Sequence, residues 1–146
     1  MRVLHINTYA TGGAANAAIR LHKGLCENGV DSKMLFLFED QTAIDNSYGY
    51  LPYDVRNYAQ DVEEANSSRL AKEKSIHNHV GNIDCEILTF PTTSFNDLHR
   101  HPLVNDADVI HLHWISRFLD YPSFFGGVNK PIVWTLHDMN PIQGLF

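Results

Sequence analysis

Two short runs near the end of the chain carry the side chains best suited to chemistry. His111 and His113 alternate along an apolar run, so a strand there would place both imidazoles on one face. The pair His137-Asp138 follows a second apolar run and precedes Pro141, which cannot continue a central strand. Because histidine titrates near neutral pH, it can act as a general base, a hydrogen-bond donor or a partner for phosphate. We therefore expect His137 to be functional; the structural alternative is a half-buried histidine beside a loop-capping aspartate.

The same side chains also admit a metal-binding interpretation. His111, His113, His137 and Asp138 could hold a divalent ion, which would make the chain a small metal-dependent hydrolase. Metal sites usually need three or four ligands with fixed outer partners, and no cysteine or glutamate cluster completes this set, so we expect no bound metal. Alternatively, one histidine of the first run packs under a helix while the other lines a polar cleft. The remaining histidines have no evident partner and are expected at the surface or in the core: His5, His22, His77, His79, His99 and His101.

A glycine pair near the N-terminus offers a different kind of site. Gly12 and Gly13 stand in a loop that leads into an alanine-rich run with helical spacing. Free backbone N–H groups and the positive end of the helix dipole would suit a phosphate or diphosphate there. The loop matches neither the Gly-x-Gly-x-x-Gly dinucleotide pattern nor the Gly-Lys-Thr nucleotide-triphosphatase pattern. A tight turn whose small residues let helix and sheet pack closely is the structural alternative.

The elements that must position these residues alternate between strand and helix. The helix that begins at Ala14 should end at Gly29, with Leu21 on its apolar stripe and His22 on its polar face. Strand, turn, helix and strand form a right-handed βαβ unit, so we predict an α/β fold with a Rossmann-like, doubly wound parallel sheet in one domain. The strands are expected at 2–8, 32–38, 109–114 and 131–136. Between the second and third of these strands we expect a loop at 39–51, a helix at 53–74, a loop at 75–84 and a strand at 85–90, unless 75–90 is irregular. Short helices are expected at 96–104 and 121–126.

In such a sheet, ligands bind beyond the carboxyl ends of the strands. We therefore expect the imidazoles of His113 and His137 to open, together with the Gly12-Gly13 turn, onto one common crevice. Trp114, where its strand ends, could belong to the core or offer a platform for a sugar ring.

Composition limits the classes of function. The chain of 146 residues has a net charge of −6, and its eleven basic residues are scattered, so we expect no nucleic-acid partner. An apolar fraction of 44% with 19% charged residues is that of a globular domain. Cys26 and Cys85 are expected to be reduced and buried. Without a signal-peptide pattern or a long apolar segment, the expected location is the cytoplasm.

Four stretches together resemble the N-terminal domain of family 4 glycosyltransferases, the retaining enzymes of the GT-B fold. A His-Leu-His-Trp strand followed by a Trp-Thr-Leu-His-Asp strand is typical of the branch that acts in bacterial surface-polysaccharide synthesis. The matching stretches are Arg2–Asn7 running into Thr11–Ala15, Ala107–Ile115, Phe118–Tyr121 and Lys130–Met139.

The resemblance implies a mechanism in which two Rossmann-like domains face each other across a cleft. The C-terminal domain would hold most of a nucleotide-sugar donor, and the N-terminal domain would hold a saccharide or lipid-linked acceptor. Transfer would retain the anomeric configuration, with the leaving group stabilised by a helix dipole and protein cations rather than a metal or another cofactor. By position, the resemblance assigns Gly12, Gly13 and Ala14 to the donor diphosphate, His137 to catalysis, and His113, Trp114 and Asp138 to the acceptor.

If the resemblance holds, the 146 residues correspond to the first domain only and do not include the family's second domain. Residues 1–146 would then be the acceptor-side domain alone, and we expect it to be inactive without a second domain, because one wall of the donor site is absent. The alternative is a non-catalytic binding or assembly module that pairs with a separate C-terminal half through an exposed apolar surface. A homodimer and a peripheral membrane contact are both compatible with the resemblance.

Overall fold

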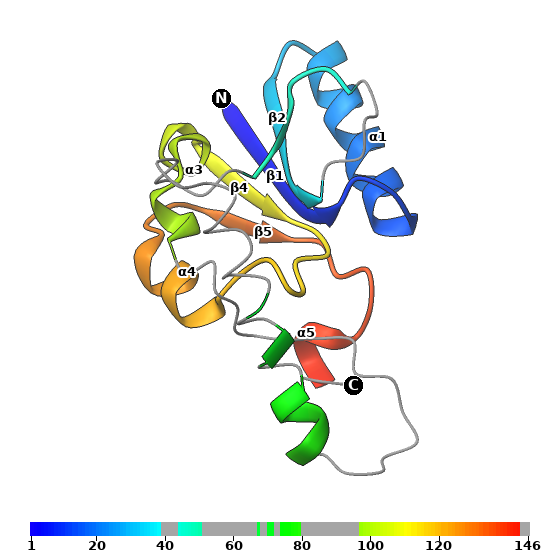
Figure 1. Ribbon diagram of the computed structural model, residues 1–146. Helices are drawn as coiled ribbons and strands as arrows, with labels where there is room; N and C mark the ends of the chain where they lie inside the picture. Colours follow the sequence, from blue (N-terminus) through cyan, green and yellow to red (C-terminus); the bar gives the residue numbers. More distant parts are fainter. Residues whose placement is uncertain (39–43, 51–66, 68–69, 72–73, 80–96, 144–146) are drawn as a thin grey trace.

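The computed structural model of the protein describes residues 1–38, 44–50, 67, 70–71, 74–79 and 97–143 (Figure 1). Its centre is a five-stranded sheet in which every neighbouring pair of strands is parallel. The spatial order, β3-β2-β1-β4-β5, is that of a Rossmann-like sheet and confirms the predicted fold class. The strands are β1 (Arg2–Tyr9), β2 (Asp31–Phe38), β3 (Ser47–Gly49), β4 (Val109–Leu112) and β5 (Ile132–Trp134).

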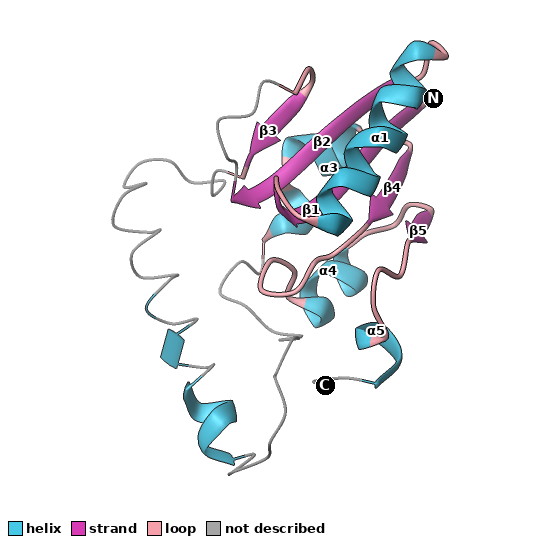
Figure 2. Ribbon diagram, turned by 90° about the vertical axis from the view of Figure 1, so that its right-hand side faces the viewer, coloured by secondary structure: helices cyan, strands magenta, loops and turns pink. Residues whose placement is uncertain are grey.

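The two faces of the sheet carry different side chains because successive residues of a strand point in opposite directions. Leu4 and Ile6 of β1, with Ile110 and Leu112 of β4, enter the main apolar core. That core lies under α3 (Pro102–Asp106) and α4 (Tyr121–Gly127), whereas α1 (Gly13–Glu27) lies on the opposite face (Figures 1 and 2). Helices on both faces make the sheet doubly wound, as predicted.

Helix α1 packs on β1 and β2 through a stripe of small residues. Ala15, Ala18 and His22 are its buried residues, three and four positions apart. The prediction for His22 was wrong: its ring is buried, with Nδ1 2.8 Å from Ser32 Oγ and Nε2 2.8 Å from the carbonyl oxygen of Asp45. The prediction for Leu21 was also wrong, since this side chain is exposed. The apolar stripe is rotated because a hydrogen-bonded imidazole can replace a leucine on the buried face.

Several element boundaries differ from the sequence prediction. β3 replaces the end of the predicted 39–51 loop; as a three-residue strand it is too short for periodicity to reveal. The predicted helix at 96–104 is divided into a 3₁₀ turn (Leu98–Arg100) and α3, because His101 precedes a proline and is extended. β4 and β5 are shorter than expected, and α5 (Asn140–Gln143) was not predicted.

Part of the middle of the chain can be compared with its prediction. Residues 74–79 are helical, which contradicts the loop predicted from residue 75. Most of the helix predicted at 53–74 and the whole strand predicted at 85–90, including Cys85, lie outside the described residues. Within the described part of the chain, no helix has both the length and the apolar character needed to cross a membrane.

At the amino-terminal edge of the sheet, charged groups fasten β1 to the segment before β4. The Arg2 guanidinium donates to Asp106 at 2.5 Å and to Asp108 at 2.7 Å, and Lys33 lies 3.4 Å from Asp106. The Arg2 guanidinium and backbone N–H bonds lower the pKa of the Asp108 carboxyl to about 2. This edge lies opposite the strand ends that carry the candidate site, so these charges hold the register of β1 and β4 from the far side.

Candidate functional site

The candidate site lies at the carboxyl edge of the sheet, where β1 and β4 end side by side. The chain builds the sheet outward from β1 in one direction and from β4 in the other, so their boundary is the topological switch point at which such sheets bind ligands. Asn7 joins the two strand ends, because its Oδ1 accepts the Trp114 backbone N–H at 2.7 Å and its Nδ2 donates to the carbonyl oxygen of Tyr9 at 2.7 Å. The backbone therefore holds Tyr9 and Trp114 beside each other.

An aromatic row runs across the ends of three strands. Tyr9 lies between Phe38 and Trp114, with ring centroids 5.2 and 5.6 Å away and nearly parallel planes. Beside this row is a hollow of about 300 Å³, lined by Asn7, Tyr9, Thr11, Gly13, Ala14 and Trp114. Flat aromatic walls with a few polar groups are typical of pockets for small organic ligands, and this volume is at the lower end of their range, about 300–1,000 Å³. Trp114 is half-buried and forms one wall of this hollow, so it is not a fully buried core residue.

The amino-terminus of α1 opens into this hollow. Gly12 precedes the helix with φ of 98°, a conformation that favours glycine, and its carbonyl oxygen accepts the N–H of Asn16 at 2.9 Å. The N–H groups of the first turn before Asn16 have no intrahelical acceptor, and neither a side-chain cap nor an acidic residue occupies that turn. Donors and the helix dipole thus favour an anion beside Gly13 and Ala14.

A second, smaller hollow lies on the other side of Trp114. Its lining residues are His113, Trp114, Ile115, Ser116, Tyr121, Trp134, His137, Asp138 and Pro141, around a volume of about 10 Å³. That is room for roughly one water molecule. Asp138 is oriented by the Trp114 indole, whose Nε1 donates to its Oδ2 at 2.9 Å. Burial, followed by the charge of Asp138, raises the pKa of the Tyr121 hydroxyl to about 12.

Three imidazoles form a hydrogen-bonded chain from this hollow into the protein. Nε2 of His137 lies 3.0 Å from Nδ1 of His113, and Nε2 of His113 lies 3.0 Å from Nδ1 of His5. Burial, reinforced by neighbouring imidazoles, lowers the pKa of both His5 and His113 to about 3, so both rings are neutral at pH 7. The chain leaves Nδ1 of His137 on the outer side of its ring, where it can serve a ligand.

The structure brings together most of the predicted site residues, but in two groups. His113, Trp114, His137 and Asp138 line the small hollow, while Gly13, Ala14 and Trp114 line the large one. The single crevice predicted for them is therefore divided, because the Trp114 indole, held by Asp138, stands between the two. Gly12 shapes the loop and is not among the lining residues.

The four residues proposed as metal ligands do not converge on one point. Among the described residues, the potential ligand atoms that gather within 4.8 Å of one another belong to His5, His111 and His113. Nε2 of His137 is instead hydrogen bonded to His113, and Asp138 to Trp114. The prediction that His111 and His113 share a face is confirmed, since their rings are stacked at 4.3 Å.

Sequence reasoning missed His5, Tyr9 and Tyr121. The expectation that His5 has no partner was wrong: in the parallel register it stands opposite His111, and its ring reaches His113. The sequence does contain a signal for His5. A Rossmann-like strand order places the first strand beside the fourth, which carries His111. His5 also lies two residues before Asn7, so both side chains are on the same face of the first strand. Tyr9 and Tyr121 carry no comparable signal in the sequence.

A scan against models of known protein families finds no match to this chain, and a search of curated proteins finds none either.

Proposed function

We propose that this chain is the acceptor-side, N-terminal domain of a retaining glycosyltransferase that uses a nucleotide-sugar donor. The observation that carries the proposal is the position of Trp114, which forms a wall of both hollows. One hollow has the anion-favouring end of α1, and the other has His137. A glycosyl donor needs both within one molecule's length, since its diphosphate is joined directly to the sugar carbon that reacts.

Each part of the donor has a matching surface in this arrangement. The diphosphate would lie at the first turn of α1, next to Gly13 and Ala14, with Gly12 fixing the loop. Trp114, supported by the stacked ring of Tyr9, offers an aromatic surface on which the C–H groups of a sugar ring or the face of a base pack well. A hollow of about 300 Å³ is too small for a whole nucleotide sugar, which agrees with a second domain supplying the rest of the site.

His137 would act on the reacting sugar through its outer nitrogen. His113 stays neutral at pH 7 and therefore orients the His137 ring without repelling a proton from it. Asp138 and His113 would line the acceptor side. The departing diphosphate gains negative charge as the glycosidic bond breaks, and the N–H groups of α1 would stabilise it in place of a metal.

Apolar side chains near the site suit a second domain or partner. Leu136, Met139 and Ile142 are exposed in the segment that follows β5. Large apolar residues close together on a surface commonly mark a contact with another protein surface. This feature equally favours the assembly alternative, in which the chain binds a separate C-terminal half or a second copy of itself without catalysing transfer.

Donor binding can be tested by titrating nucleotide diphosphates and nucleotide sugars while recording tryptophan fluorescence. The chain has two tryptophans, and Trp114 forms the wall of the proposed site. A Cβ at Gly13 would meet no protein atom within 4 Å, so Gly13→Ala should fold normally but place a methyl group against the diphosphate. We expect it to weaken binding about tenfold or more, equivalent to about 1.4 kcal/mol.

Gly24→Ala is the matched control, because it adds the same methyl group to the same helix away from the site. The control should bind as the unmodified chain does. Saturable binding that Gly13→Ala leaves unchanged would refute the assignment of the diphosphate to this turn. Transfer assays should give weak or undetectable turnover by residues 1–146 alone, and robust turnover would contradict the need for a second domain.

A further inference from the structure

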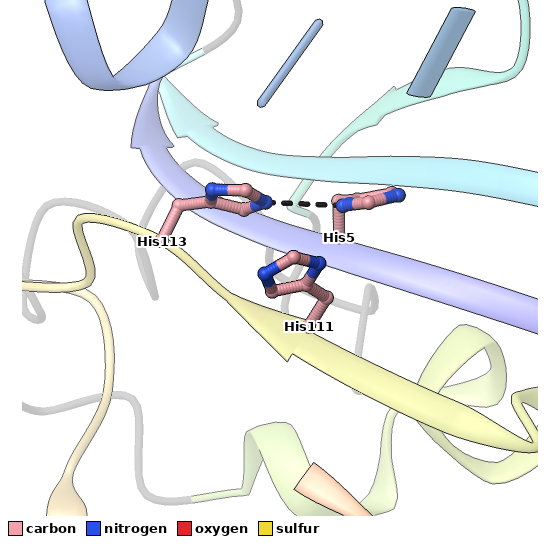
Figure 3. Close-up of side chains that lie close together, drawn as sticks. All are labelled: His5, His111 and His113. Carbon is pink, nitrogen blue, oxygen red and sulfur yellow. Dashed lines mark hydrogen bonds between the residues drawn. The ribbon is translucent and has the colours of Figure 1, made fainter. Parts of the chain in front are cut away.

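We propose that His5, His111 and His113 form a binding site for one divalent transition-metal ion, best matched to zinc, between β1 and β4 beneath α1. One nitrogen from each of the three rings lies within 4.8 Å of the other two. Figure 3 shows the three imidazoles converging from the two strands. This site differs from the predicted metal set by including His5 and omitting His137 and Asp138, and it does not rest on the proposed glycosyltransferase function.

The backbone fixes the three rings in this arrangement. His5 and His111 are register partners in the parallel pairing of β1 with β4, so their side chains leave the sheet side by side. His113 follows His111 by two residues and therefore points to the same face. His113 lies one residue beyond β4, but its backbone N–H still donates to the Ile6 carbonyl oxygen at 3.0 Å. Ligands whose backbone is hydrogen bonded into a sheet are held more precisely than ligands on free loops.

The separations of the nitrogens fit a metal with little adjustment. Nδ1 of His5 and Nε2 of His113 are 3.0 Å apart. Two imidazole nitrogens bound tetrahedrally at about 2.0–2.1 Å from zinc are about 3.3–3.4 Å apart, so this pair needs to separate by only a few tenths of an ångström. The nitrogen of His111 lies no more than 4.8 Å from the other two nitrogens. It must therefore approach them by at most about 1.4 Å to reach the separation of about 3.4 Å found around zinc, and a rotation of the side chain supplies this shift.

Two of the three rings already have the outer partners that metal-bound histidines use. Nε2 of His111 lies 2.7 Å from Thr135 Oγ1, which leaves Nδ1 on the other side of the ring. Nδ1 of His113 lies 3.0 Å from Nε2 of His137, so its Nε2 can be the ligand. A ligating imidazole almost always donates its remaining N–H to such an acceptor, which fixes its tautomer and strengthens it as a ligand.

The third ring, His5, is fully buried and its Nε2 has no hydrogen-bond partner among the described residues. In Figure 3 this nitrogen points away from the other two rings, so Nδ1 is the atom that faces the site. Burial lowers the pKa of His5 and His113, so both rings are neutral at pH 7. One of the two facing nitrogens carries the proton of their hydrogen bond, and a metal can bind both once that proton has moved to the other nitrogen of the same ring. Imidazole ligands suit zinc, and three of them leave a fourth position for water.

The site can be tested with cobalt and zinc, added to the whole chain after treatment with a chelator. Cobalt(II) held by three imidazoles and a water in near-tetrahedral geometry absorbs visible light strongly, and zinc should displace it at one ion per chain. Side-chain nitrogen NMR of the unmodified chain should show that zinc shifts the signal of one ring nitrogen in each of three histidines to the position of a metal-bound nitrogen. The proposal would be overturned if cobalt gave no visible absorption, or if zinc left the NMR signals of the three hydrogen-bonded imidazoles unchanged.

Variants assign the ligands. His111→Gln removes the least buried of the three rings, and we expect at least a 100-fold loss of zinc affinity with the fold intact by circular dichroism. His137→Gln should weaken binding about 10- to 100-fold by removing an outer partner. Asp138→Asn should bind as the unmodified chain does, and a loss there would favour the other metal set and overturn this one. His79→Gln changes an exposed histidine and is the matched control. If His79→Gln and His111→Gln lost the same zinc affinity, the site would be refuted.

Discussion

Acidification should destabilise the metal-free chain through His5 and His113. Burial lowers the pKa of both imidazoles to about 3, with a smaller contribution from His111 beside them, whereas an unfolded chain has histidine pKa values near 6.5. Between these values the unfolded state binds protons that the folded state rejects, so the free energy of unfolding rises with pH. The stabilisation is complete above about pH 6.5 and declines as the pH falls towards 3.

The size of the effect follows from the proton linkage. At pH 5.0 an unfolded histidine is almost fully protonated, and each buried ring then lowers the free energy of unfolding by about 2 kcal/mol relative to pH 7.5. His5 and His113 together contribute about 4 kcal/mol, a large part of the total stability of about 5–15 kcal/mol typical of a domain. Burial also lowers the pKa of His101 and His111, which adds to the loss in the same direction.

Urea unfolding at pH 7.5 and 5.0, in the presence of a chelator, measures this loss. His113→Gln removes one of the two groups, so the difference between the two pH values should shrink by about 2 kcal/mol. His79→Gln removes an exposed imidazole and should keep the full difference. If His113→Gln and the control lose the same stability on acidification, the His113 ring does not stay neutral in the folded protein and the reasoning fails.

Two further substitutions test the helix and the core. Gly24→Ala, in the interior of α1 where a Cβ meets no atom within 4 Å, should raise the free energy of unfolding by about 0.5–1 kcal/mol in urea, and a decrease would show an unrecognised contact. Phe118→Ala, in the main core with a fully buried ring, should lower it by about 3–5 kcal/mol because a cavity remains; a loss below about 1 kcal/mol would mean that the core collapses around the site.

The parts of the fold that could be predicted are those in which local pattern and burial agree. β1, β2 and α1 were found within a few residues because continuous apolar runs and a helical stripe arise from contacts on each element's own faces. His22 shows where this reasoning ends. A histidine looks polar in the sequence, and only its hydrogen-bond partners Ser32 and Asp45, brought by β2 and the segment before β3, make its burial favourable.

The sequence predicts the edge of the sheet at which the candidate residues lie, but not their arrangement there. The edge follows from topology, since strand ends of a parallel sheet meet there. The division into two hollows depends on the rotamer of Trp114, which the Asp138 carboxylate fixes. The pairing of His5 with His111 depends on register between strands about a hundred residues apart, and no periodicity within either strand encodes that register.

The position of the imidazoles relative to α1 explains how one cluster can be buried and still reachable. α1 packs on β1 and β2, and exposure on this face of the sheet increases across the strands, from 0% for His5 through 9% for His111 to 49% for Val133. Val133 is the register partner of His111 on β5. His111 therefore lies at the border between the covered and the open parts of the face, and a small ion approaching over β5 meets it first. The same chain of rings ends at His137 in the small hollow, so an ion bound under α1 and a ligand bound beyond the strand ends would both act on His113.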